Sequence, residues 1–142
     1  MPEITFIDQS WTINAPAPEV FGCLQEVEQW PEWASKIKSA SRSGTGALSP
    51  GETIQFVPDF ILPLPLSATV GSVEEPRRIS WGVSVPGFTI EHRFDIRADG
   101  QSCEISQFES ARGLLAPTSF PFKSMLYELD QQWGDDLADH LR

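Results

Sequence analysis

Residues 119–141 read SFPFKSMLYELDQQWGDDLADHL and place an apolar side chain at nearly every helical turn. The apolar positions recur every three to four residues, which is the period of a helix with one buried face. We therefore predict a long helix from Ser119 to His140. At 1.5 Å per residue, its apolar stripe spans roughly 28 Å, enough to cross a sheet of six or seven strands. The stripe consists of Phe122, Leu126, Leu129, Trp133, Leu137 and Leu141, with Met125 beside it.

Before this helix, strand-like segments follow one another at short, regular intervals. The connections between them are only a few residues long and contain proline or glycine. Parallel strands need crossovers of a dozen or more residues, so we expect each pair of neighbours to be antiparallel. The predicted strands are Thr53–Val57, Leu66–Glu74, Arg78–Val85, Phe88–Arg97 and Ser102–Ala111.

The N-terminal third adds a strand at each end and helices between them. Ile4–Ile13 and Ile37–Ser43 are predicted strands, and Pro16–Glu28 has helical spacing. Pro31 interrupts that helix, and a short second helix follows to about Ser35. The order predicts an α+β fold: a curved antiparallel sheet of six to seven strands around a long C-terminal helix, with two short helices after the first strand.

The composition is that of a globular protein with an unusual charge. A chain of 142 residues with 40% hydrophobic and 21% charged residues fits one domain over residues 1–142. The net charge of -10 disfavours nucleic acid and anionic membrane surfaces as partners. No apolar run approaches the roughly 20 residues of a membrane span, so we expect no stable membrane insertion. Nothing in the sequence indicates an oligomeric state.

The N-terminus and the cysteines indicate a cytoplasmic protein. The first residues lack the basic start and apolar stretch of a signal peptide. Cys23 and Cys103 are too few for a disulfide framework and lack the spacing of metal ligands. Glycine-rich phosphate loops and nucleophile elbows are also missing from the sequence. We therefore expect no metal site and no cofactor.

Strand alternation predicts which side chains face the inside of the sheet. In Phe88–Arg97 the even positions are apolar except for His92. In Ser102–Ala111, Ile105 marks the odd positions as the inner set, which brings Gln107 and Glu109 inside. One helix fills a concave sheet poorly, so we expect a mostly apolar cavity with these three polar residues as anchors. His92 and Glu109 lie on neighbouring strands and could meet across the ladder.

Several other residues are candidates to line this cavity. Tyr127 lies beside the helix stripe, where its hydroxyl could reach the cavity mouth, and Trp33 follows the helix break next to the sheet. The proposed ligand-binding set is Trp33, Phe56, Phe60, Trp81, Val83, Ile90, His92, Phe94, Gln107, Glu109 and Tyr127. Three roles stay open for His92 and Glu109: a hydrogen-bonded core pair, a ligand-orienting pair, or acid and base groups of an enzyme.

Two surface segments have unusual compositions. Pro58–Leu66 combines three prolines with five large apolar residues, so it is a candidate lid, a candidate partner surface, or a segment packed against the last helix. The last helix carries Asp135, Asp136 and Asp139 near its C-terminus, which we interpret as a solvated face. Gly134 beside them costs helix stability and suggests a close contact or a bend.

Several short motifs together resemble a known family. They are TINAP at 12–16, WPEW at 30–33, PRRISW at 76–81, EHRF at 91–94 and GLL at 113–115. Their order and spacing resemble the polyketide cyclase/dehydrase family of the START-like (SRPBCC, helix-grip) superfamily. That resemblance implies the helix-grip fold. The superfamily includes lipid and sterol carriers, quinone-binding proteins, aromatase/cyclases and hydrolases, so the fold alone does not select an activity.

Three functions follow as hypotheses. The first is non-catalytic binding or transport of a hydrophobic small molecule such as a lipid, quinone or polyketide in the internal cavity. The second is a polyketide cyclase or dehydratase in which His92 and Glu109 act as acid and base. The third is an interaction module that uses the fold without a ligand.

Overall fold

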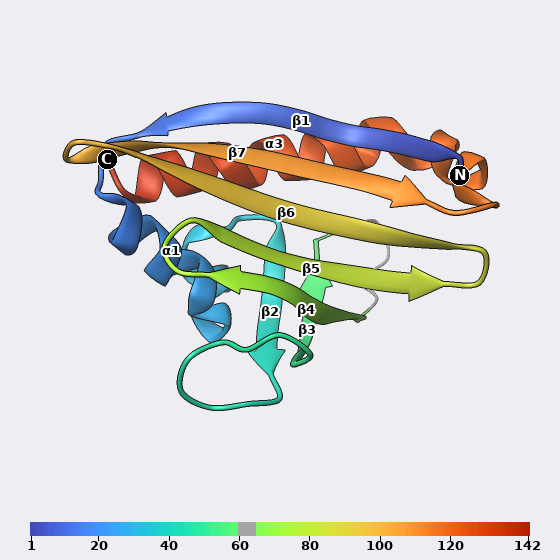
Figure 1. Cartoon of the computed structure of the whole chain (residues 1–142), viewed down its shortest axis with the longest axis horizontal. Coiled ribbons are helices and arrows are strands. Elements are labelled where there is room, and N and C mark those ends of the chain that lie inside the picture. Colours follow the sequence, from blue (N-terminus) through green and yellow to red (C-terminus); the bar gives the residue numbers. More distant parts are fainter. Residues whose placement is uncertain (60–64) are drawn as a thin grey trace.

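The computed structural model describes residues 1–59 and 65–142 and contains one seven-stranded antiparallel sheet. The strand order is β1-β7-β6-β5-β4-β3-β2, so β2 to β7 form a meander that returns strand by strand to β1 (Figure 1). The strands are β1 (Glu3–Ile13), β2 (Ile37–Arg42), β3 (Thr53–Pro58), β4 (Leu66–Glu74), β5 (Arg78–Val85), β6 (Phe88–Asp99) and β7 (Ser102–Arg112).

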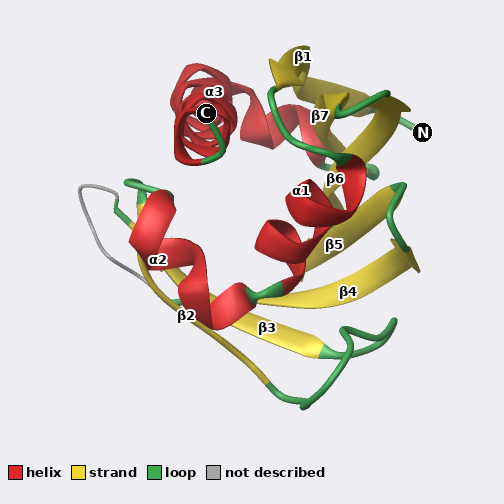
Figure 2. Cartoon of the chain, turned by 90° about the vertical axis from the view of Figure 1, so that its left-hand side faces the viewer, coloured by secondary structure: helices red, strands yellow, loops and turns green. Residues whose placement is uncertain are grey.

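All helices lie on the concave side of this sheet (Figure 2). They are α1 (Ala17–Gln25), the 3-10 helix η1 (Val27–Gln29), α2 (Trp30–Trp33), the 3-10 helix η2 (Ala116–Phe122) and α3 (Lys123–His140). The chain crosses from β1 at one sheet edge to β2 at the other through α1, η1 and α2. The predicted α+β architecture, a curved antiparallel sheet gripping the C-terminal helix, is confirmed.

Two helix predictions need correction. The predicted helix over residues 16–28 divides into α1 and η1. The last helix begins at Lys123 rather than at Ser119, because residues 116–122 form a 3-10 helix that contains Pro121. Proline has no N–H for an α-helical hydrogen bond, and its ring clashes with the preceding turn. Phe122 ends this 3-10 helix and is exposed, so the buried stripe starts at Leu126 instead.

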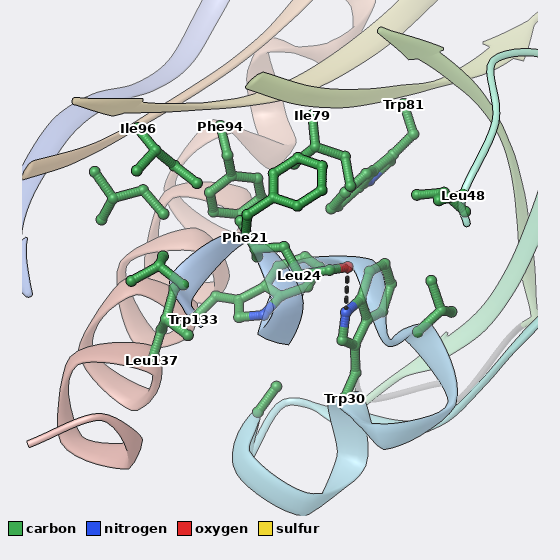
Figure 3. Close-up of a cluster of buried hydrophobic side chains, with 14 of the residues drawn as sticks. Phe21, Leu24, Trp30, Leu48, Ile79, Trp81, Phe94, Ile96, Trp133 and Leu137 are labelled. Atoms are coloured by element: carbon green, nitrogen blue, oxygen red, sulfur yellow. Dashed lines mark hydrogen bonds between the residues drawn. The ribbon is translucent and has the colours of Figure 1, made fainter. Parts of the chain in front are cut away.

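Three tryptophans from different elements meet in the core between the sheet and the helices (Figure 3). The ring centroid of Trp30 lies 5.1 Å from that of Trp81 on β5 and 5.1 Å from that of Trp133 on α3. Trp30 is fully buried, and its indole N–H donates to the backbone oxygen of Leu24 at 3.1 Å. These contacts hold α2 and α3 against the same part of the sheet. They close one end of the space between α3 and the sheet.

The acidic end of α3 lies largely at the surface, as predicted, with Asp135 and Asp139 exposed, and two of its carboxylates also bind other elements. Asp135 Oδ1 accepts a hydrogen bond from Trp11 Nε1 of β1 at 2.9 Å. Asp136 Oδ2 accepts from the backbone N–H and the hydroxyl of Ser35, at 2.8 and 2.7 Å. Both carboxylates therefore hold α3 in place over the sheet.

Gly134 allows α3 to approach β1 closely. A β-carbon at this position would lie 2.3 Å from Cε2 and Cζ2 of Trp11, well inside van der Waals contact. We predict that Gly134→Ala destabilises the protein by about 1–3 kcal/mol, since overpacking outweighs the gain of about 1 kcal/mol in helix propensity. Urea unfolding followed by tryptophan fluorescence measures this change.

Gly22 in α1 is the matched control. A β-carbon there meets nothing within 4 Å, so Gly22→Ala should stabilise the protein by about 0.5–1 kcal/mol. Equal effects of the two substitutions would show that the Trp11 contact does not restrict residue 134.

Candidate functional site

Four polar residues gather under α3, inside the sheet. In the β6–β7 register His92 lies directly opposite Glu109, and Gln107 is two residues further along β7. Asp130 reaches the same point from α3. The exposed fractions are 4% for His92, 0% for Gln107, 8% for Glu109 and 5% for Asp130. Strand alternation thus directs the three strand residues inward, as predicted.

Gln107 orients the group through two hydrogen bonds. Its amide Nε2 donates to the backbone oxygen of Asp130 at 2.8 Å. With Nε2 bound there, the amide oxygen Oε1 of Gln107 points toward His92 and lies 2.6 Å from His92 Nε2. Because Oε1 only accepts, His92 Nε2 carries the proton and donates it. In the neutral imidazole, Nδ1 is then the free acceptor, and it faces Glu109 Oε2 at 3.5 Å.

The two carboxyl groups influence each other strongly. Burial raises the pKa of Glu109 well above its usual range, and the neighbouring carboxyl group of Asp130 raises it further. Glu109 Oε1 and Asp130 Oδ2 are both buried, and neither has a hydrogen-bond partner among the described residues. Unpaired buried oxygens are costly, which makes these two atoms candidates to bind a ligand.

An apolar cavity of about 190 Å³ adjoins this polar group. The sheet contributes Phe56, Trp81, Val83 and Ile90 to its wall, and α3 contributes Leu126, Leu129 and Trp133. His92, Glu109 and Asp130 line the same cavity, and Lys36 is its further charged residue. A mostly apolar pocket with a few convergent polar groups is the usual form of a small-molecule site.

Six of the eleven sequence-proposed site residues line this cavity. They are Phe56, Trp81, Val83, Ile90, His92 and Glu109. Two more lie just behind the wall. Phe94 is buried in the aromatic core, with its ring centroid 4.8 Å from that of His92, and Gln107 supports His92 from behind.

Of the remaining three candidates, two lie away from the cavity and one falls outside the described residues. Tyr127 is partly exposed and its hydroxyl donates to Gln9 of β1 at 3.2 Å, because its position on α3 turns it toward the sheet edge. Trp33 stacks on His140 at a centroid distance of 6.2 Å, on the outer side of Trp133. Phe60 and most of the Pro58–Leu66 segment lie outside the described residues, although Pro58 and Leu66 both line the cavity.

Asp130 is the site residue that sequence reasoning missed. It follows Leu126 by four residues and precedes Trp133 by three, so helical spacing places it on the apolar face of α3. A lone carboxylate inside such a stripe was the signal that could have identified it.

His92, Glu109 and Asp130 also form a group that could hold a metal ion. Each offers one ligand atom, and these atoms lie within 4.8 Å of one another. The sequence predicted no metal site, because the three residues come from three separate elements and form no local motif. However, His92 Nε2 already donates to Gln107, so only Nδ1 remains as a ligand atom.

Comparison with known proteins places this geometry among related folds. The family described as "Polyketide cyclase / dehydrase and lipid transport" matches residues 6–126. A START superfamily protein from Mycobacterium smegmatis is similar in structure, with a TM-score of 0.75 and 17% identity over 95% of each chain. The di-domain ARO/CYC BexL from the BE-7585A biosynthetic pathway has a TM-score of 0.73 and 18% identity, covering 98% of this chain and 46% of that one.

A truncated norcoclaurine synthase from Thalictrum flavum is also similar, with a TM-score of 0.74 and 11% identity over 98% of this chain and 93% of that one. At these identities the structures establish the fold alone. No curated protein matches the sequence significantly. Within the part of the chain that the structure describes, no helix has both the length and the hydrophobicity to cross a membrane.

Proposed function

Because the chain belongs to the polyketide cyclase / dehydrase and lipid transport family, we propose that its cavity binds a hydrophobic small molecule such as a lipid, quinone or polyketide. Family and fold make it a START-like domain of the ligand-binding or cyclase type. The observation that carries the proposal is the cavity between the sheet and α3, which is apolar except at the end formed by His92, Glu109 and Asp130. Transfer of an apolar molecule from water into such a cavity lowers the free energy.

The size of the cavity favours a compact ligand. About 190 Å³ is less than the roughly 300–1,000 Å³ that encloses a drug-sized molecule, but more than the ~150 Å³ engineered cavity that binds benzene. One or two fused rings fit this space. A quinone head group or an aromatic polyketide unit therefore fits better than a whole lipid.

Native mass spectrometry of protein purified from cells tests this function. We expect a bound molecule of low mass that organic extraction releases, or saturable binding of an apolar ring compound from a panel of lipids and quinones. Protein that carries no ligand and binds no member of the panel would contradict the proposal.

A second candidate is an acid–base enzyme of the cyclase or dehydratase type. Glu109 with its raised pKa faces His92 Nδ1 at 3.5 Å, and both line the cavity. A carboxyl group with a raised pKa keeps its proton to a higher pH, which suits it to donate a proton to a substrate. Two proteins of similar fold, norcoclaurine synthase and the ARO/CYC BexL, have names that denote enzymes. Under this function His92→Ala should abolish turnover of a bound ketone while the fold stays intact.

The remaining features fit a binding domain better than a ligand-free interaction module. A ligand in the cavity could form hydrogen bonds with the buried, unpaired carboxyl oxygens. An interaction module without a ligand would need neither the cavity nor these oxygens. We propose that residues 1–142 form one such domain. Cys23 and Cys103 are both free thiols, which supports the proposed cytoplasmic location.

A further inference from the structure

We propose that the ligand carries a positively charged nitrogen on its apolar body, and that the carboxylates of Glu109 and Asp130 bind this nitrogen. This inference rests on the proposed function, since it specifies the chemistry of the molecule in the cavity. The ligand class is an amine or ammonium compound with one or two rings.

The charges around the cavity are the first argument. Both carboxyl groups are more than nine-tenths buried, line the cavity and have one oxygen each without a partner among the described residues. His92 is the only basic side chain within 4.0 Å of either, among the residues that the structure describes. Its Nε2 proton is already committed to Gln107. Lys36 also lines the cavity but forms no ion pair with Glu109 or Asp130 in the described structure.

The aromatic wall beside the carboxylates is the second argument. Trp81 and Trp133 both line the cavity, with ring centroids 5.7 Å apart. Each ring centroid lies within 5.3 Å of the His92 ring, so both indoles border the polar end. Aromatic faces attract cations, most strongly where water is excluded. Indole faces together with unpaired carboxylates form a site for an organic ammonium group.

A neutral ligand makes the opposite prediction for the effect of pH. Because the pKa of Glu109 is raised, a bound ammonium group would drive a proton off Glu109, and affinity would increase as the pH rises. A ketone or alcohol that accepts a hydrogen bond from protonated Glu109 would bind more weakly as the pH rises, because Glu109 then loses that proton. The groups that face Glu109 are His92 from β6 and Asp130 from α3, while its neighbour on β1 is the apolar Ile7.

Calorimetric titration with three compounds of one shape tests the inference. The probes are 1-naphthylmethylamine, 1-naphthalenemethanol and 1-naphthoic acid, which share a two-ring body and differ in charge. We expect the amine to bind about tenfold or more tighter than the alcohol, with an affinity that increases as the pH rises, and the acid to bind more weakly than either.

Two variants locate the preference in the carboxylates. Glu109→Gln combined with Asp130→Asn should reduce the affinity for the amine about tenfold or more and leave the affinity for the alcohol nearly unchanged. Both amides keep the side-chain shape, and the Asp130 backbone oxygen that binds Gln107 is retained. Glu104→Gln is the control, because Glu104 lies on the outer face of β7 and pairs with Arg97.

Three results would overturn the inference. The alcohol could bind as tightly as the amine, or the preference for the amine could persist in the double variant; the binding function would survive both. Elemental analysis could instead find a metal held one to one by the native protein and lost in Glu109→Gln, which would assign the cluster to an inorganic cation. If none of the three compounds binds while a lipid or quinone does, the inference fails and the binding function survives.

Discussion

Glu109→Gln is expected to stabilise the folded protein by about 1–4 kcal/mol at pH 8 and to change its stability little at pH 4. Burial and the neighbouring Asp130 raise the pKa of Glu109 in the folded state, whereas an unfolded glutamate titrates near pH ~4.3. The folded protein therefore holds this proton more tightly than the unfolded chain. The stability that protonated Glu109 provides is complete below about pH 4.3 and is lost as the pH rises toward the folded value. Glutamine cannot ionise and avoids this loss.

Urea unfolding of both proteins from about pH 4 to 8 measures the effect as a difference. The difference is needed because Glu52 acts in the opposite direction. Hydrogen bonds from Arg42 hold the pKa of Glu52 at about 2, so its contribution is lost as the pH falls below about 4.5. Both proteins share that change. If the difference in the free energy of unfolding stays constant from pH 4 to 8, the pKa of Glu109 is not raised by folding.

Val83→Trp is expected to weaken the binding of 1-naphthylmethylamine about 100-fold while the protein remains folded. Val83 points from β5 into the cavity, where it lies between Trp81 and Val85 on the inner face. The larger indole would occupy the space that the ligand needs. A cavity of about 190 Å³ can accept much of the indole, so the new side chain can enter it without displacing the core. Calorimetric titration measures the loss.

Ser84→Trp adds the same indole to the next residue and serves as the control. Ser84 is exposed and points to the outer face of β5, where it faces Thr89 of β6. Its binding should match that of the native protein within about threefold. If the two variants bind equally well, the ligand does not occupy the cavity between the sheet and α3.

The fold follows from the sequence because its signals are local and agree with one another. Strand β5 begins and ends where alternation predicted, and short connections force the antiparallel meander. The pairing of His92 with Glu109 also follows from alternation and strand adjacency alone. The start of α3 was less predictable. The preceding 3-10 helix contains Pro121, and its phenylalanines have the spacing of a continuing apolar stripe.

The site was harder to predict because it depends on where α3 crosses the sheet. Alternation shows that Trp81 and Phe94 both point inward, but the position of Trp133 decides that Trp81 borders the cavity and Phe94 is core. The role of Asp130 was hard to predict for the same reason. Helical spacing places it on the buried face, but only the packed structure brings it next to Glu109.

A crystal structure of the protein with 1-naphthylmethylamine tests the ligand site most directly. We predict density for the two rings in the cavity beside Trp81 and Trp133, with the nitrogen within hydrogen-bond distance of Glu109 or Asp130. A cavity filled by the protein's own side chains, or a ligand bound elsewhere on the surface, would contradict the assignment of this cavity as the binding site.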